Sequence, residues 1–331
     1  KISTGSYIIA LPSSWIKLNN LSPHDPLLII NNGKSLIIKP ADKKESPINV
    51  KIDVDLIPDV NTLLYIIQMY YLQGVNTIQV TSNNIIKAEV KKKIKGLSNV
   101  LPNIDIQDIS GNLLQINVDD SQNFIRRDYL INIFTRMFKF TLRLLEDLKQ
   151  ALMNNDSMLM QEMVERSKDI KKRYAYVVRL LAKISQMPEY SSLSIREIVI
   201  YAEIARDLFQ LINHVANAIN YMQSVDFGNA DIVNKVLNLV SVLIDMFTNT
   251  MDYFNNREIT LITYIKDKMS KVKAIEYDVL STVLSGHTNV SCGDKLDKIL
   301  NLMYLVRELR RIAGYCIAIM DDISQLYLGP F

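Results

Sequence analysis

Residues 194–222 read SIREIVIYAEIARDLFQLINHVANAINYM, and this stretch decides the fold class. Apolar side chains recur every three or four positions from Ile198 to Met222, which is the period of an amphipathic helix. Ser194 and Glu197 are spaced as a capping box, so the helix is predicted to begin there. The residues Arg206-Asp207-Leu208 within it are matched 101 positions later by Arg307-Glu308-Leu309. The stretch is therefore one copy of a repeated helical unit.

The repeat extends over three helices. Asn154-Asn155 matches Asn255-Asn256 at the same offset of 101 residues, and two unrelated helical hairpins would seldom share that register. We therefore predict an all-α domain at 126–331 that contains two three-helix repeats, 126–224 and 229–328. Apolar positions spaced by three or four residues place the first two helices over 130–152 and 159–184, and the last three over 230–253, 257–284 and 294–327.

The first 45 residues have a different pattern of short strands and turns. Tyr7–Leu11 is an apolar run stopped by Pro12, which predicts a strand, and Ser13–Leu18 predicts one helical turn with a serine cap. Two further strands, 26–30 and 35–38, are joined through Asn32-Gly33, a strong hairpin signal. So few short strands bury little apolar surface, and this domain (1–45) is expected to need a partner chain.

Residues 48–122 predict a small α/β domain. Strands are expected at Val50–Leu56, Thr77–Thr81 and Leu113–Val118. Asp59 is the predicted cap of a helix that runs from about Asn61 to Gln73 and stops at Gly74. A second helix is expected to be capped by Asn83 or Asn84. The overall fold class is thus multidomain α+β: a β domain, an α/β segment and a helical bundle.

Composition limits the possible functions. The 331 residues are 48% apolar and 22% charged, which excludes a disordered chain, and the net charge of +3 is too small to indicate nucleic-acid binding by itself. Two cysteines, Cys292 and Cys316, cannot form a disulfide framework and fit a cytoplasmic protein. No segment is apolar enough to insert into a membrane. Nucleophile motifs, phosphate loops and dinucleotide-binding loops are missing as well, so we do not expect an enzyme.

Two features of the bundle could carry chemistry. Glu165 and Asp169 have the i, i+4 spacing that lets two carboxylates on one helix face bind one metal ion. The competing interpretation is a solvated charged face, because lysines and arginines surround both residues. His214 lies in an apolar helix and is expected to be a hydrogen-bonded structural histidine rather than a ligand.

The order of these segments resembles a known family. The run Thr4-Gly5-Ser6-Tyr7-Ile8-Ile9-Ala10-Leu11-Pro12, followed by Trp15, Asp25, Asn32-Gly33 and Leu36–Pro40, resembles the SpoVT–AbrB swapped-hairpin domain, although His24 stands where that family has glycine. The tandem three-helix repeat resembles PhoU, the phosphate-uptake regulator. Together they resemble the AbrB-fused PhoU regulators of archaeal type.

The resemblance implies an intertwined homodimer that binds DNA and takes part in phosphate homeostasis. The implied DNA contacts are Lys1, Ser6, Lys17 and Lys34, all in the first domain. The alternative is a PhoU-type accessory protein that docks on phosphate transporter subunits or a sensor kinase without binding DNA. The expected mechanism for the first hypothesis is a change in the relative placement of the two DNA-binding domains when the bundle binds a partner or ligand.

The resemblance also implies that the family's metal clusters are degenerate here. The acidic pair on the second helix is retained as Glu165 and Asp169. The ligand positions on the third helix are Phe209 and Asn213, and in the second repeat Arg310 and Gly314. Because two carboxylates cannot hold a multinuclear cluster, we expect no cofactor beyond one weakly bound metal ion at Glu165 and Asp169.

Overall fold

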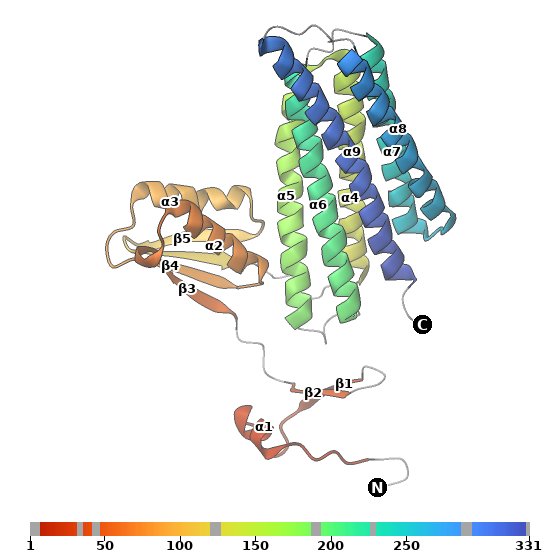
Figure 1. Ribbon diagram of the computed structural model, residues 1–331. Helices are drawn as coiled ribbons and strands as arrows, with labels where there is room; N and C mark the ends of the chain where they lie inside the picture. Colours follow the sequence, from red (N-terminus) through yellow and green to blue (C-terminus); the bar gives the residue numbers. More distant parts are fainter. Residues whose placement is uncertain are drawn as a thin grey trace. The chain divides into compact units, whose positions relative to one another are not determined.

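The computed structural model describes residues 7–31, 36–41, 47–119, 127–186, 193–225, 230–285 and 293–328. The chain divides into two compact units, residues 1–48 and 49–331 (Figure 1). The second unit holds both the α/β domain and the helical bundle. Its two apolar cores are separate: one lies in the α/β domain and the other in the bundle.

Among its described residues, the first unit contains one short helix and one hairpin. The helix α1 (Ser13–Leu18) was expected, but its N-cap is Pro12 and no side chain caps it, so the predicted serine cap is wrong. The antiparallel hairpin of β1 (Leu27–Asn31) and β2 (Leu36–Pro40) confirms the two predicted strands, while the Asn32-Gly33 turn lies outside the described residues. Residues 7–11 form no strand in the single chain, because none of the described strands pairs with them.

The α/β domain is a two-layer structure with a four-stranded sheet. The strand order is β3-β4-β6-β5, in which β3 and β4 are parallel and the other pairs antiparallel. Alternate residues Ile78, Val80, Leu114 and Ile116 are buried under both helices on one face of the sheet. The elements in chain order are β3 (Asn49–Asp53), α2 (Val60–Leu72), β4 (Thr77–Thr81), α3 (Ala88–Lys95), β5 (Ile104–Ser110) and β6 (Leu113–Val118).

Three details of this domain differ from the sequence prediction. The first strand ends at Asp53 and continues as a 3₁₀ turn, Val54–Leu56. The helix α3 starts at Ala88 without a side-chain cap, so neither Asn83 nor Asn84 caps it; the backbone N–H of Asn83 instead donates to Asp55 Oδ2 at 2.7 Å. The strand β5 was not predicted, although Ile104 and Ile106 alternate with polar residues; the alternation stops after Gln107, and the rest of the strand is exposed.

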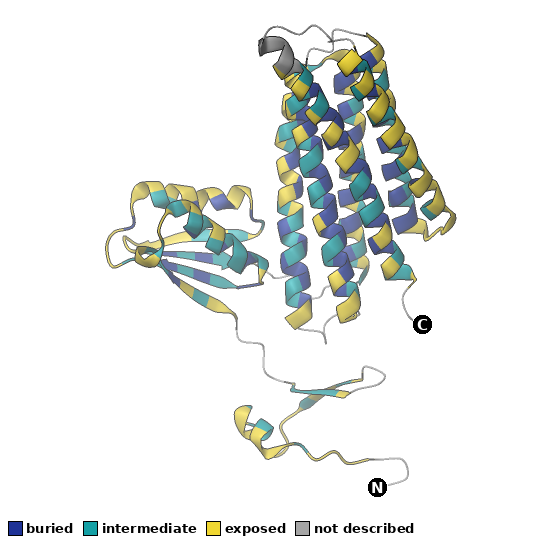
Figure 2. Ribbon diagram, in the orientation of Figure 1, coloured by how far each residue is buried: buried dark blue, intermediate teal, exposed yellow. Residues whose placement is uncertain are grey.

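The predicted C-terminal domain is a bundle of six long helices, each with one buried face (Figures 1 and 2). All six predicted helices are confirmed, as is the capping box of Ser194 and Glu197. The second helix continues through Ser167, whose buried hydroxyl donates to the Val164 carbonyl at 2.7 Å. The helices are α4 (Arg127–Asn154), α5 (Ser157–Gln186), α6 (Ile195–Ser224), α7 (Ala230–Asn256), α8 (Thr260–Ser285) and α9 (Gly293–Tyr327).

Candidate functional site

The third helices of the two repeats, α6 and α9, form the most extensively packed pair of the bundle. His214 on α6 lies 2.6 Å from Glu308 on α9, measured from Nδ1 to Oε2, and Asn217 donates to the same oxygen at 3.2 Å. The His214 ring also stacks on Tyr315. A carboxylate only accepts hydrogen bonds, so Nδ1 carries the proton. The expected structural role of His214 is confirmed.

Two helical turns along α6 from His214, the α6–α9 interface carries acidic residues. Asp207, the repeat equivalent of Glu308, accepts a hydrogen bond from Arg206 Nε at 3.1 Å. The nearby Asp322 is buried, and its Oδ2 atom has no hydrogen-bond partner. Burial, followed by the charges of Asp207 and Glu203, raises the pKa of Asp322 to about 7. This carboxyl group therefore changes protonation state near neutral pH.

The predicted metal pair lies on the exposed face of α5. Glu165 accepts from Lys168 at 2.6 Å and Asp169 is 3.7 Å from Lys172, while the two carboxylate side chains are 69% and 58% exposed. On the neighbouring helix, Phe209 stacks on Tyr174 with ring centroids 4.5 Å apart. In the described part of the chain, no three His, Cys, Asp or Glu side chains gather as metal ligands would. A metal ion at Glu165 and Asp169 stays a prediction.

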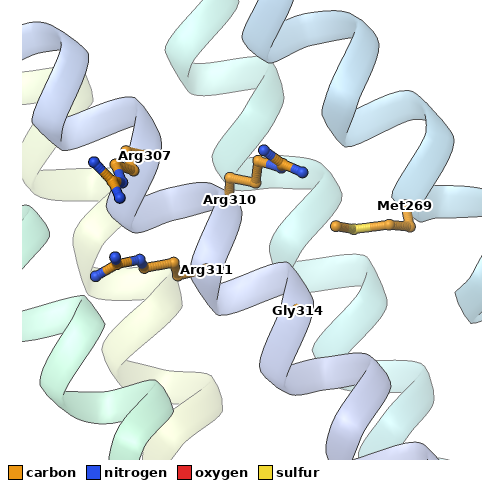
Figure 3. A pocket seen from close by; sticks show the side chains of 5 residues that line it. All are labelled: Met269, Arg307, Arg310, Arg311 and Gly314. Atoms are coloured by element: carbon orange, nitrogen blue, oxygen red, sulfur yellow. The ribbon is translucent and has the colours of Figure 1, made fainter.

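The corresponding region of the second repeat borders a shallow cavity whose exposed lining is mostly apolar. Five residues of α8 and α9 line a cavity of about 330 Å³: Met269, Arg307, Arg310, Arg311 and Gly314. We refer to these five residues as the arginine pocket. Figure 3 shows Arg310 extending toward the helix that carries Met269, while Arg307 and Arg311 lie on the other side of α9. The family resemblance indicated that Arg310 and Gly314 occupy positions where metal ligands are lost. It did not indicate that both residues border a cavity.

Basic residues elsewhere are less concentrated. Lys17, a predicted DNA contact, is exposed in the last turn of α1, whereas Lys1, Ser6 and Lys34 lie outside the described residues. On α3, Lys91 forms an ion pair with Asp108, with 2.8 Å between Nζ and Oδ1. The thiol of Cys316 is buried, and burial raises its pKa to about 12, so it is unreactive.

A buried arginine connects the α/β domain to the bundle. Arg179 on α5 is only 2% exposed and donates from Nη1 to the carbonyl oxygens of Tyr71 and Val75 at 2.7 and 2.9 Å. Tyr71 lies in the last turn of α2 and Val75 three residues beyond its end; the Tyr71 carbonyl also accepts from the backbone N–H of Gly74 at 3.1 Å. The sequence analysis missed this contact. Its only signal is one cation inside the apolar run Tyr174–Ala182.

The comparisons with known proteins concern the bundle. The PhoU domain family model matches residues 134–222 and 236–323, which together exceed half of the chain and correspond to the two predicted repeats. No curated protein matches the chain. Among the described residues, no helix combines the length and apolar character needed to cross a membrane.

Two solved structures share the fold of the bundle. One is the phosphate transport system regulatory protein PhoU from Streptococcus pneumoniae, with a TM-score of 0.54 and 13% identity over 61% of this chain and 95% of that one. The other is PhoU from Pseudomonas aeruginosa, with a TM-score of 0.54 and 15% identity over 61% of this chain and 97% of that one.

Proposed function

Because the chain belongs to the PhoU family, we propose that it regulates phosphate transport, with no catalytic role. The two matched PhoU repeats are the observation that carries this proposal, supported by the same fold in a protein described as a phosphate transport system regulator. In this proposal the bundle binds a partner or ligand, and the first unit binds DNA as a homodimer.

The first unit favours a dimer because it has no core of its own. None of its described residues is buried, and its apolar side chains are open to water; Tyr7 is 87% exposed, Ile9 54% and Ile29 58%. A stable domain buries its apolar side chains against another layer. A second copy of the same segment would supply that layer and would give residues 7–11 the pairing partner they lack in one chain.

DNA binding would follow from the same dimer. A twofold pair of these units doubles every positive charge, including the exposed Lys17, and the negative backbone of DNA attracts several cations on one surface. The resemblance to the SpoVT–AbrB domain rests on the sequence motif alone.

Two measurements test this proposal. First, Ile9→Asp with Ile29→Asp is expected to convert a dimer to monomers by light scattering, because a charge would be placed in the dimer core; a Met158→Asp variant, at an exposed position on the bundle, is the control. Second, binding to the DNA upstream of the chain's own operon should weaken steeply with salt and be lost in Lys17→Gln, but not in Lys171→Gln. DNA binding that survives removal of residues 1–48 would contradict the proposal.

The alternative, an accessory protein that docks on a transporter subunit or sensor kinase, is favoured by one end of the bundle. The start of α6, the α7–α8 turn and the end of α9 meet there: Arg196 contacts the Gln325 carbonyl and Arg257 stacks on Tyr327. Four apolar side chains are exposed in these segments: Ile195, Val199, Ile259 and Leu328. Capture of transporter subunits by residues 49–331, abolished by Ile195→Asp, would favour docking without DNA.

A further inference from the structure

Aromatic, amide and arginine side chains form a continuous strip along the α6–α9 pair. Tyr221 on α6 stacks on Tyr304 of α9 with ring centroids 5.2 Å apart, and His214 stacks on Tyr315 at 5.3 Å. Glu308, which contacts His214, lies between the two stacks along α9, and positions 304, 308, 311 and 315 share one side of a helix. We call this strip the α6–α9 face and define it by Asn217, Tyr221, Tyr304, Arg307, Arg311 and Tyr315.

The α6–α9 face is open to solvent, whereas the contacts beneath it are buried. Tyr304 is 43% exposed, and the side chain of Arg311 is 46% exposed. The His214 and Glu308 side chains below them are only 12% and 9% exposed. Figure 3 shows Arg307 and Arg311 on the same side of α9. Because buried contacts hold its side chains in place, the face is a pre-formed surface.

The composition of the α6–α9 face differs from that of a solvated helix surface, which interleaves acidic and basic side chains. Although 22% of the chain is charged, residues 208–224 of α6 contain no aspartate, glutamate, lysine or arginine. Residues 299–320 of α9 contain arginines but no lysine and no aspartate, and their one carboxylate, Glu308, is buried. Loss of lysine and carboxylates together with enrichment of tyrosine and arginine is typical of protein–protein interfaces.

The positive charge of the α6–α9 face is only partly balanced within the described part of the chain. Glu308 is shared by His214, Asn217 and Arg311. Arg307 has no carboxylate partner among the described residues. The Arg311–Glu308 ion pair is a single contact at 3.3 Å, and each guanidinium has five N–H donors. Most donors of both arginines therefore have no carboxylate acceptor.

We propose that the α6–α9 face binds an acidic segment of a partner protein. Carboxylates of the partner pair with Arg307 and Arg311, because the arginine fork matches a carboxylate. Apolar side chains beside them pack on Tyr304 and Tyr221, whose rings offer apolar area with a polar tip. The acidic chemistry of the partner follows from the face itself, whereas its membership of a phosphate-regulation system rests on the proposed function.

Other occupants match the α6–α9 face less well. DNA and anionic membranes are attracted by larger groups of cations than these two arginines. In a twofold dimer the same face would meet itself. The carboxylate of the face, Glu308, is buried and already paired, so a second copy offers no anion to Arg307 and Arg311.

Biolayer interferometry with the full chain tests the proposal. The probes are the phosphate transporter subunits and the sensor kinase of the same organism, each purified separately. At least one of them should bind, with an affinity that falls as salt is raised. Arg307→Gln with Arg311→Gln should weaken binding about tenfold or more, and Tyr304→Ala about tenfold, because arginine and tyrosine dominate interface energetics.

Arg310→Gln is the matched control. Arg310 is a neighbour of Arg311 and also forms one ion pair with a glutamate, Glu276, at 3.1 Å. It belongs to the arginine pocket but not to the α6–α9 face, and Figure 3 shows that it extends to the other side of α9. Its replacement should therefore change the affinity by less than about twofold.

A cross-linking experiment tests the acidic character of the partner. Arg307→Lys keeps the charge and supplies a primary amine, which a carbodiimide joins to a carboxylate that contacts it. Mass spectrometry should find position 307 coupled to an aspartate or glutamate of the bound probe. Arg310→Lys should give no product with the probe. Binding without coupling at position 307 would overturn the acidic partner.

The remaining outcomes separate the α6–α9 face from its competitors. The proposal is wrong if no probe binds, or if binding is unchanged in the double arginine variant, whose fold is checked by circular dichroism. It is also wrong if that variant converts a dimer to monomers or loses DNA, because the face then belongs to a second copy or to nucleic acid. Binding that is lost only in Ile195→Asp would place docking at the end of the bundle. A probe that binds through the face supports the proposal even if the chain binds no DNA, so the two proposals can fail separately.

Discussion

Replacing Arg179 by alanine should separate the α/β domain from the bundle. Arg179 reaches from α5 to the C-terminal end of α2, where Gly74, with φ +88°, reverses the chain. Its guanidinium lies over the Tyr71 ring, 4.9 Å from the centroid, and donates to two backbone carbonyls. The Arg179 side chain thus donates to carbonyls at the end of α2, compensates the negative end of the α2 dipole and packs between the α/β domain and the bundle.

The size of the effect follows from these contacts. Hydrogen bonds that involve a charged partner contribute about 1.5–3 kcal/mol each, and two are lost. A cation at a helix C-terminus adds up to about 2 kcal/mol in a partly buried site. Because the contributions overlap, we expect Arg179→Ala to lower the free energy of unfolding by about 4 kcal/mol. That is a large fraction of the roughly 5–15 kcal/mol that stabilises a typical domain.

Urea denaturation followed by circular dichroism measures this change, and hydrogen exchange in β4 reports on the α/β domain separately. Arg179→Lys keeps the charge but not the planar fork, so we expect it to lose about half as much stability. Arg173→Ala, an exposed position on the same helix, is the control and should cost less than about 0.5 kcal/mol. If Arg179→Ala costs no more than about 1 kcal/mol, the reasoning is refuted.

Three further predictions concern single groups. The pKa of Asp322 is raised to about 7 in the folded protein, so the contribution of this group to stability is largest in acid and is lost as pH rises from about 4 through 7. Asp322→Asn should remove this part of the pH dependence and gain about 1–2 kcal/mol at pH 8; a pH dependence of stability that is unchanged in the variant would exclude Asp322 as a contributor. Glu308→Ala removes the acceptor that His214, Asn217 and Arg311 share, so it should lower the free energy of unfolding in urea by about 2–3 kcal/mol. A loss below about 1 kcal/mol would show that water replaces the carboxylate. Gly74→Ala places a side chain on a residue with positive φ, and its new Cβ atom would lie 3.0 Å from Lys183 Cγ. The variant should therefore lower the free energy of unfolding by about 1–2 kcal/mol. An unchanged melting temperature would argue against strain at this turn.

The helices of the bundle were predictable because their cause is local. A long amphipathic helix repeats its apolar residues every three or four positions, and each of the six segments contains enough turns to make that period unambiguous. The capping box at Ser194 and the 101-residue offset then fixed one helix start and the duplication. The edge strand β5 carried a weaker signal, because its apolar alternation covers only Ile104 and Ile106 and its other residues are polar or exposed.

The sequence by itself therefore determined the helical periods and the repeat. Only the tertiary structure decided which side chains meet across helices: Arg179 with the end of α2, His214 with Glu308, and Arg310 with Glu276. The physical reason is that backbone periodicity is set by neighbours a few residues apart. Ion pairs and cavities instead depend on the packing of segments about one hundred residues apart, which no local pattern encodes.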